Sequence, residues 1–153
     1  MRVHVICGGG TGTRLLLALD SLGAELSAGP LAPEDTDTRT LLKLGGRWCA
    51  MEPSPNVSPW SIEEVRPWLE AVVVTPFAVG HGNVANLDIA ADLARHRPLY
   101  ILEGADITHR DYTGGIATQR MRGLETTARA RVRGSGALAA RIRQDLSSGP
   151  AGG

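Results

Sequence analysis

The sequence predicts an α/β fold, with one domain built on a mostly parallel five- or six-stranded sheet and helices on both of its faces. Strand patterns alternate with helix patterns along the chain, and the connections between them are short. Such connections imply right-handed crossovers between parallel strands. With 153 residues and 42% hydrophobic content, the chain can bury one core. We therefore predict one ligand-binding domain at 1–148 and a disordered tail at 149–153.

Hydrophobic patterning places the elements. Short apolar runs indicate strands, whereas leucines at helical spacing, as in 11–22, indicate amphipathic helices. The run at 71–77 is the most apolar, which predicts a central strand covered on both faces, while 127–134 is expected to be an edge strand. The expected strands are 3–7, 24–29, 47–51, 71–77, 97–104 and 127–134, and the expected helices are 11–22, 35–46, 83–95, 113–125 and 136–148.

Capping and breaking residues refine the helix ends. One of residues 35–37 is expected to cap the second helix. Ser61 and Glu64 have the spacing of a capping box, but Pro67 follows closely. Because proline interrupts a helix, we expect a short helical turn after Ser61 that restarts at Pro67.

Composition excludes several classes of function. The formal net charge is zero, and the arginines of 109–146 are interleaved with alanines, which indicates a solvated helix face and no nucleic-acid partner. The alternative is an interaction module in which this basic region meets phosphate or an acidic partner. Cys7 and Cys49 form no CxxC pair and are expected to be reduced core thiols, and the four histidines lack the spacing of a metal site. Without a leader or an apolar run of about 18 residues, we expect a cytoplasmic protein with no membrane insertion.

A glycine-rich stretch, "CGGGTGTR", joins the first strand to the first helix. Glycines there let the backbone approach an anion, and the helix start offers unpaired N–H groups. No Gly-Lys-Ser/Thr follows, which excludes a Walker-type P-loop, and the second strand ends in Gly29-Pro30-Leu31 without the acid that a nicotinamide site needs. A tight turn without a ligand is the alternative. The expected ligand contacts are Gly8, Gly9, Gly10, Thr11, Gly12 and Thr13.

The fourth strand leads into a similar stretch, "TPFAVGHGNVANLD", and the fifth into "RDYTGG". The second turn is expected to bind by the same logic, with its amides fixing the orientation of the ligand. In the alternative, Asn83 only caps the helix and Asn86 is an exposed first-turn residue. The third turn lies on the same edge and is expected to close over a bound molecule. The expected contacts are Thr75, Pro76, Gly80, His81, Gly82, Asn83 and Asn86, followed by Thr113, Gly114 and Gly115.

The acids of "EDTD" resemble a magnesium ligand pair, but helix capping explains them as well. We therefore predict no metal site and leave the cofactor open. His81 is expected to have a mild role in its loop, with no direct part in chemistry.

The motifs resemble the carboxyl-terminal accessory domain of some ATPase subunits of cobalamin and iron-complex importers. The resemblance covers about residues 3–120 and includes "GGGTG", "AELSAGPL", the step Asp35-Thr36-Asp37, "PFAVGHGNVANL" and "YTGG". It implies a nucleotide-containing ligand such as a corrinoid, and a separate transporter ATPase as partner.

More distantly, the layout is similar to the LOG-type nucleotide-binding family, which implies a Rossmann-like domain and a homodimer. Members of that family split the base from a nucleoside monophosphate, with a GGGxxG loop and a PGGxGTxxE loop. Here Asn83 and Asn86 replace the threonine and the glutamate of the second loop. An amide cannot act as a general base, which is typically worth about 10²–10⁴-fold in rate.

We therefore predict binding of a phosphate-bearing or carboxylate-bearing small molecule without catalysis. The alternative is a nucleoside-monophosphate phosphoribohydrolase or related transferase, which would have to use Asp88, His81 or Asp37 as its catalytic group.

Overall fold

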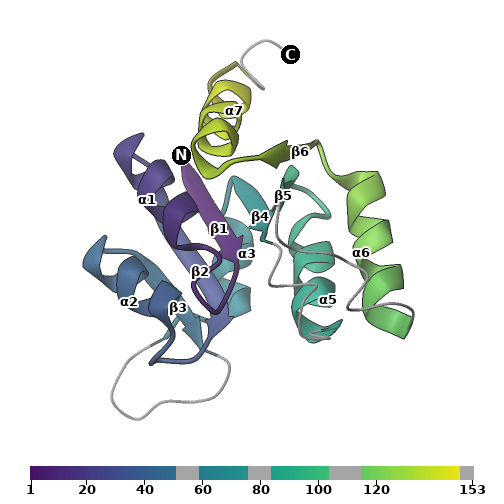
Figure 1. Ribbon diagram of the computed structural model, residues 1–153, viewed down its shortest axis with the longest axis horizontal. Helices are drawn as coiled ribbons and strands as arrows, with labels where there is room; N and C mark the ends of the chain where they lie inside the picture. The colour runs from purple at the N-terminus through teal and green to yellow at the C-terminus, as the bar shows by residue number, and fades with distance from the viewer. Residues whose placement is uncertain (51–58, 76–83, 104–114, 149–153) are drawn as a thin grey trace.

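A computed structural model of the protein describes residues 1–50, 59–75, 84–103 and 115–148 (Figure 1). The expected tail at 149–153 lies outside the described residues. Within the described helices, none has the length and apolar character needed to span a bilayer.

The six strands form one sheet in the order β3-β2-β1-β4-β5-β6. Every neighbouring pair is parallel, which confirms the predicted α/β architecture. β4 lies between β1 and β5 with all of its residues buried, as its apolar sequence predicts. The strands are β1 (Arg2–Ile6), β2 (Glu25–Leu31), β3 (Arg47–Ala50), β4 (Ala71–Val74), β5 (Leu99–Glu103) and β6 (Ala130–Arg133).

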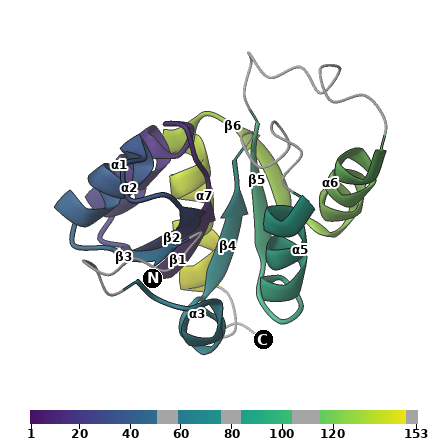
Figure 2. The same cartoon turned by 90° about the horizontal axis from the view of Figure 1, so that it is seen from below.

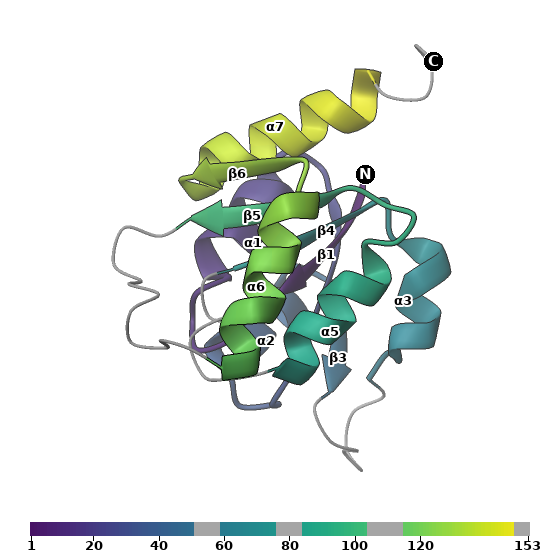
Figure 3. The ribbon, with the colours of Figure 1, turned by 90° about the vertical axis from the view of Figure 1, so that its right-hand side faces the viewer.

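Helices cover both faces of this sheet (Figures 2 and 3). α1, α2 and α7 pack on one face, while α3, α5 and α6 pack on the other. This is the three-layer arrangement of a Rossmann-like domain. The helices are α1 (Thr13–Ser21), α2 (Thr36–Lys43), α3 (Ile62–Trp68), α5 (Val84–Leu93), α6 (Gly115–Thr127) and α7 (Ser135–Ser148).

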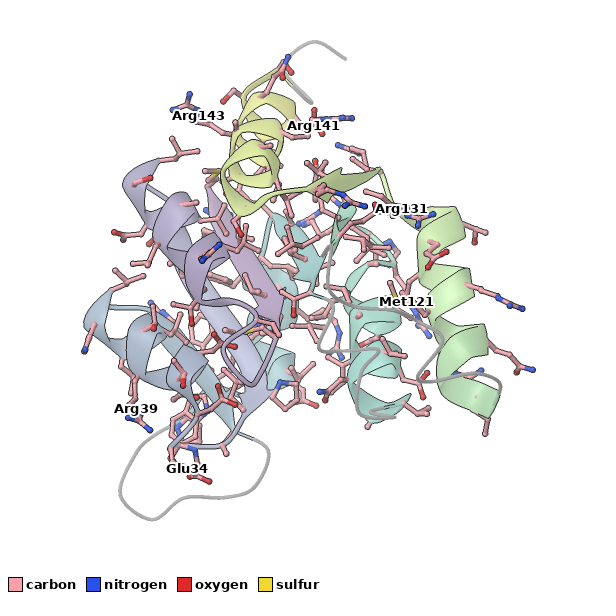
Figure 4. The ribbon with its side chains drawn as sticks, viewed as in Figure 1. Glu34, Arg39, Met121, Arg131, Arg141 and Arg143 are labelled. Atoms are coloured by element: carbon pink, nitrogen blue, oxygen red, sulfur yellow. The ribbon has the colours of Figure 1, made fainter. Side chains whose placement is uncertain are left out.

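Alternate residues of the inner strands supply two hydrophobic clusters, one beneath each helical layer. In β1, Val3 and Val5 pack beneath α1 and α7, whereas Ile6 packs beneath α3 and α5. Val3, Val5 and Ile6 are fully buried, so both faces of the sheet are covered at β1. Figure 4 shows Met121 lying between α6 and α5, where it extends the second cluster.

The third helix differs from the sequence expectation at Pro67. The capping box of Ser61 and Glu64 is present as predicted, but α3 runs to Trp68 without restarting at Pro67. Pro67 lies in the last turn, where it removes only one intrahelical N–H donor before the helix ends. The Leu69 N–H still donates to the Val65 carbonyl at 2.9 Å, which closes that turn.

Both edges of the sheet are protected. β6 is the edge strand that was predicted, and it alternates half-buried residues with the exposed Arg131 and Arg133. Arg131 pairs with Glu103 on β5 at 2.7 Å. At the other edge Trp60 forms a parallel bridge with Cys49 of β3, and its N–H donates to the Trp48 carbonyl at 2.6 Å.

Candidate functional site

The sheet reverses its winding between β1 and β4. The helices that follow these neighbouring strands, α1 and α5, lie on opposite faces, so the carboxyl ends of β1 and β4 form the switch point of the sheet. The Thr11 hydroxyl, in the turn after β1, lies 2.9 Å from the Thr75 hydroxyl, directly after β4. Thr75 also donates to the Ile6 carbonyl at 3.1 Å. These contacts join the glycine-rich turn to the end of β4.

The fold itself explains three of the four glycines in the first turn. Gly9 and Gly10 have φ values of 64° and 87°, which side chains rarely adopt. Gly12 lies against Cys7, where a Cβ would come within 2.6 Å of the Cys7 Cβ. Gly10 differs from Gly12 because a Cβ there would meet no atom of the described residues within 4 Å. The described part of the chain therefore leaves space beside Gly10.

Two carboxylates from the start of α2 reach into this turn. The Gly9 N–H donates to Asp35 Oδ2 at 3.0 Å, and the Gly12 N–H donates to Asp37 Oδ2 at 3.3 Å. The Thr13 hydroxyl donates to Asp37 Oδ1 at 2.8 Å. Asp35 is also the N-cap of α2, because its Oδ1 accepts from the Asp37 N–H at 2.9 Å. The turn therefore binds anionic oxygen, and the chain's own carboxylates supply it.

Of the remaining backbone N–H groups in the turn, three have a partner within the turn and that of Gly10 does not. The Thr11 N–H donates to the Gly8 carbonyl at 3.2 Å and the Thr13 N–H to the Gly10 carbonyl at 3.4 Å, while the Gly8 N–H points to the Thr11 hydroxyl at 3.4 Å. Among the residues that the structure describes, none accepts from the Gly10 N–H. Gly10 thus combines an available donor with open space.

Asn86 lies in the first turn of α5, at the edge of the sheet where β4 ends. Only 4% of the residue is exposed, so the alternative of an exposed first-turn residue is wrong. Within the described part of the chain, its Nδ2 has no hydrogen-bond partner. A buried amide without a partner costs about 1–3 kcal/mol, which makes Asn86 the residue here that most needs an external acceptor.

The predicted contacts that remain come from the second and third glycine turns. The structure describes one of them, Gly115, which is the first residue of α6. The others lie outside the described residues, and they are Pro76, Gly80, His81, Gly82, Asn83, Thr113 and Gly114.

The acids of the enzymatic alternative are engaged elsewhere. Asp88, on α5, accepts from Arg120 of α6 at 2.8 Å, and its side chain is about half exposed. Asp37 is fully buried and holds the glycine-rich turn. In the described part of the chain, no three histidine, cysteine or acidic side chains lie close enough together to hold a metal ion. The N-cap role of Asp35 confirms helix capping as one function of the "EDTD" acids.

A buried polar row crosses β1 and β2 on the face opposite α1. His4 Nε2 lies 3.0 Å from the Gly29 carbonyl, and His4 Nδ1 lies 2.9 Å from the Ser27 hydroxyl. Since a carbonyl only accepts, Nε2 carries the proton and Nδ1 accepts from Ser27. Burial lowers the pKa of His4 from 6.5 to about 4, against the smaller opposing effect of the Gly29 bond. His4 is therefore a neutral, structural residue at neutral pH.

Both cysteines are free and buried, as predicted. Burial raises the pKa of Cys7 well above its usual value, and the Asp37 carboxylate beside it raises that pKa further. Burial likewise raises the pKa of Cys49 to about 11. Neither thiol is suited to nucleophilic chemistry at neutral pH.

Asp35 is a site residue that the sequence predicts only as a candidate helix cap. The missing signal was topological. α2 follows β2, which lies beside β1, so the first turn of α2 begins at the same sheet edge as the glycine-rich turn.

Two open hollows of about 400 and 440 Å³ lie near the amino end of β5, around the connection between α5 and β5. They are at the end of the strands opposite the glycine-rich turn. Arg95, His96 and Arg97 line both of them. Asp92 pairs with Arg66 and Arg95 there, which offsets part of the positive charge. Neither hollow is lined by the glycine-rich turn, by Thr75 or by Asn86.

A family model, that of the MJ0874 family, matches residues 26–138 of this chain. The protein belongs to the MJ0874 family. The matched region starts inside β2 and ends inside α7, so it contains Asp35, Asp37, Thr75 and Asn86 but not the glycine-rich turn. No curated protein and no solved structure matches the sequence.

Proposed function

We propose that this MJ0874-family protein binds a phosphate-bearing small molecule, of the nucleotide class, at the switch point between β1 and β4. The observation that carries the proposal is the Thr11–Thr75 hydroxyl contact of 2.9 Å, which joins the first turn to the end of β4 at the switch point. In parallel α/β sheets this is the place where ligands bind.

Local chemistry supports an oxygen-rich, anionic ligand. None of the described residues accepts from the Gly10 N–H, and Gly10 lies shortly before the start of α1, where the helix dipole favours negative charge. Asn86 Nδ2 supplies a second donor from the start of α5. The bonds from Gly9 and Gly12 to carboxylates support the same preference, because they are made by anionic oxygen.

We propose binding without catalysis. The support is that Asp88 is held by Arg120 and that Asp37 is buried within the fold. A phosphoribohydrolase needs a carboxylate at the reacting carbon, and the contacts of these two acids with Arg120 and with the glycine-rich turn favour a structural role for both. The homodimer and the partnership with a transporter ATPase stay predictions from the resemblance.

The test is isothermal calorimetry of the full chain with AMP, comparing the Gly10→Val and Gly134→Val variants. Gly134 has φ of 94° and no atom within 4 Å of an added Cβ, so it matches Gly10, whose φ is 87°, in backbone strain and in open space. We expect Gly10→Val to abolish AMP binding and Gly134→Val to preserve it. Equal affinities in both variants would refute the site.

Native mass spectrometry of protein purified from its own cells adds the identity of the ligand. An adduct that carries phosphate and is lost in Gly10→Val is the expected result. Base release from AMP that disappears in Asp88→Asn or Asp37→Asn would replace the binding proposal with the enzymatic alternative.

A further inference from the structure

We propose that Asp35 is a built-in competitor for the anionic group of the ligand, so that a phosphate reaches the Gly9 N–H of the glycine-rich turn only by displacing this carboxylate. The inference rests on the proposed function and names the residue that sets its affinity and selectivity.

Both oxygens of Asp35 are engaged. Oδ1 accepts from the Asp37 N–H at 2.9 Å within the cap of α2, and Oδ2 accepts from the Gly9 N–H at 3.0 Å across 26 residues of sequence. The second bond uses the kind of donor that a phosphate would need. One N–H serves one strong acceptor well, so the carboxylate and a ligand phosphate exclude each other at Gly9.

Exposure distinguishes Asp35 from Asp37. Asp37 is 0% exposed and binds both Gly12 and Thr13, so it is part of the folded core. Asp35 is only partly buried, and its bond to Gly9 lies at the protein surface. Its carboxylate can therefore leave Gly9 for water while the rest of α2 stays in place.

Charge adds to this competition. A phosphate beside Gly9 that does not displace Asp35 lies against a like charge, which disfavours it. Asn86 is the complementary feature, because it is a buried donor with no acceptor among the described residues and without a competing carboxylate. A ligand that carries a second acceptor gains a hydrogen bond from Asn86 when it displaces Asp35. Inorganic phosphate has to displace Asp35 without that bond, so the larger ligand is selected.

The test substitution is Asp35→Asn. Asparagine is as good an N-cap as aspartate, so α2 keeps its bond from the Asp37 N–H. Because the amide oxygen accepts that bond, the amide NH2 group is left facing the Gly9 N–H, and two donors cannot bond to each other. The Gly9 N–H is then available to an external anion.

Glu34→Gln is the matched control. Glu34 is exposed and adjacent to Asp35, and it is labelled at the start of α2 in Figure 4. Its backbone carbonyl accepts from Arg39 at 2.8 Å, and this bond does not depend on the side chain. The control therefore removes the same formal charge without touching the turn.

Calorimetric titration of the wild type and both variants with AMP and with inorganic phosphate measures the effect, and a thermal melt checks that each variant is folded. We expect Asp35→Asn to bind both probes about tenfold more tightly, with the larger gain for phosphate, and Glu34→Gln to change affinity by less than about twofold.

Each other outcome overturns the inference. Weaker AMP binding by Asp35→Asn would make Asp35 a direct ligand contact, and unchanged affinity would show that the ligand does not use Gly9; both leave the proposed function standing if the wild type binds AMP. If none of the three proteins binds either probe, the proposed function and this inference fall together.

Discussion

Acidification from pH 7.5 to pH 4 is expected to destabilise this protein through His4. The folded state holds His4 neutral between Ser27 and Gly29, and its pKa is lowered from 6.5 to about 4. The unfolded chain takes up this proton as the pH falls through 6.5, whereas the folded protein resists until about pH 4. The contribution of His4 to stability is therefore complete above pH 6.5 and is lost progressively down to pH 4.

The size of the effect follows from the two pKa values. They lie about 2.5 units apart, and one unit corresponds to about 1.4 kcal/mol. Stability should therefore fall by up to about 3.5 kcal/mol across this range, with a steepest slope of about 1.4 kcal/mol per pH unit. This is a large share of the roughly 5–15 kcal/mol that holds a typical domain together.

The assay is urea unfolding at several pH values for the wild type, His4→Gln and His96→Gln. Glutamine at position 4 keeps a donor and an acceptor but has no titrating group. The free energy of unfolding of His4→Gln should therefore fall less steeply with decreasing pH than that of the wild type. His96 is exposed, and its substitution should leave the slope unchanged. Parallel pH curves for the wild type and His4→Gln would refute the reasoning.

Three further predictions concern the site and the cysteines. Asn86→Leu should raise the free energy of unfolding by about 1 kcal/mol, because it removes a buried donor without a partner, and should abolish AMP binding in calorimetry; a loss of stability would reveal a structural partner. Asp37→Asn should lower the unfolding free energy by about 1–3 kcal/mol in urea, since either Gly12 or Thr13 loses its acceptor, and an unchanged midpoint would contradict this. Cys7 and Cys49 should not react with a thiol reagent at pH 8 until the protein unfolds; rapid labelling of the native protein would show that their burial is incomplete.

Hydrophobic patterning was sufficient to predict the architecture. Ala71 and the three valines that follow it make residues 71–74 apolar at every position, which is typical of a strand covered on both faces, and the structure places them at the centre of the sheet. The arginines of β6 alternate with smaller residues, as expected at an edge. Such patterns depend on neighbours along the chain, so one sequence is enough to interpret them.

The contacts within the site were not predictable in the same way. The bond between Asp35 and Gly9 joins residues 26 positions apart, and it forms only because β1 and β2 are neighbours in the sheet. The burial of Asn86 likewise depends on how α5 packs against the sheet. Local signals predict that an aspartate caps a helix, but tertiary structure decides which donor its second carboxylate oxygen accepts from.

The guarded sheet edges limit how two copies of the protein can associate. Joining two six-stranded sheets into one continuous sheet requires a free row of backbone donors and acceptors on an outer strand. On one side Trp60 already takes a backbone bond of β3, and on the other side guanidinium groups project from β6. These features disfavour sheet-to-sheet joining, so we expect a homodimer of this chain to associate through its helical layers.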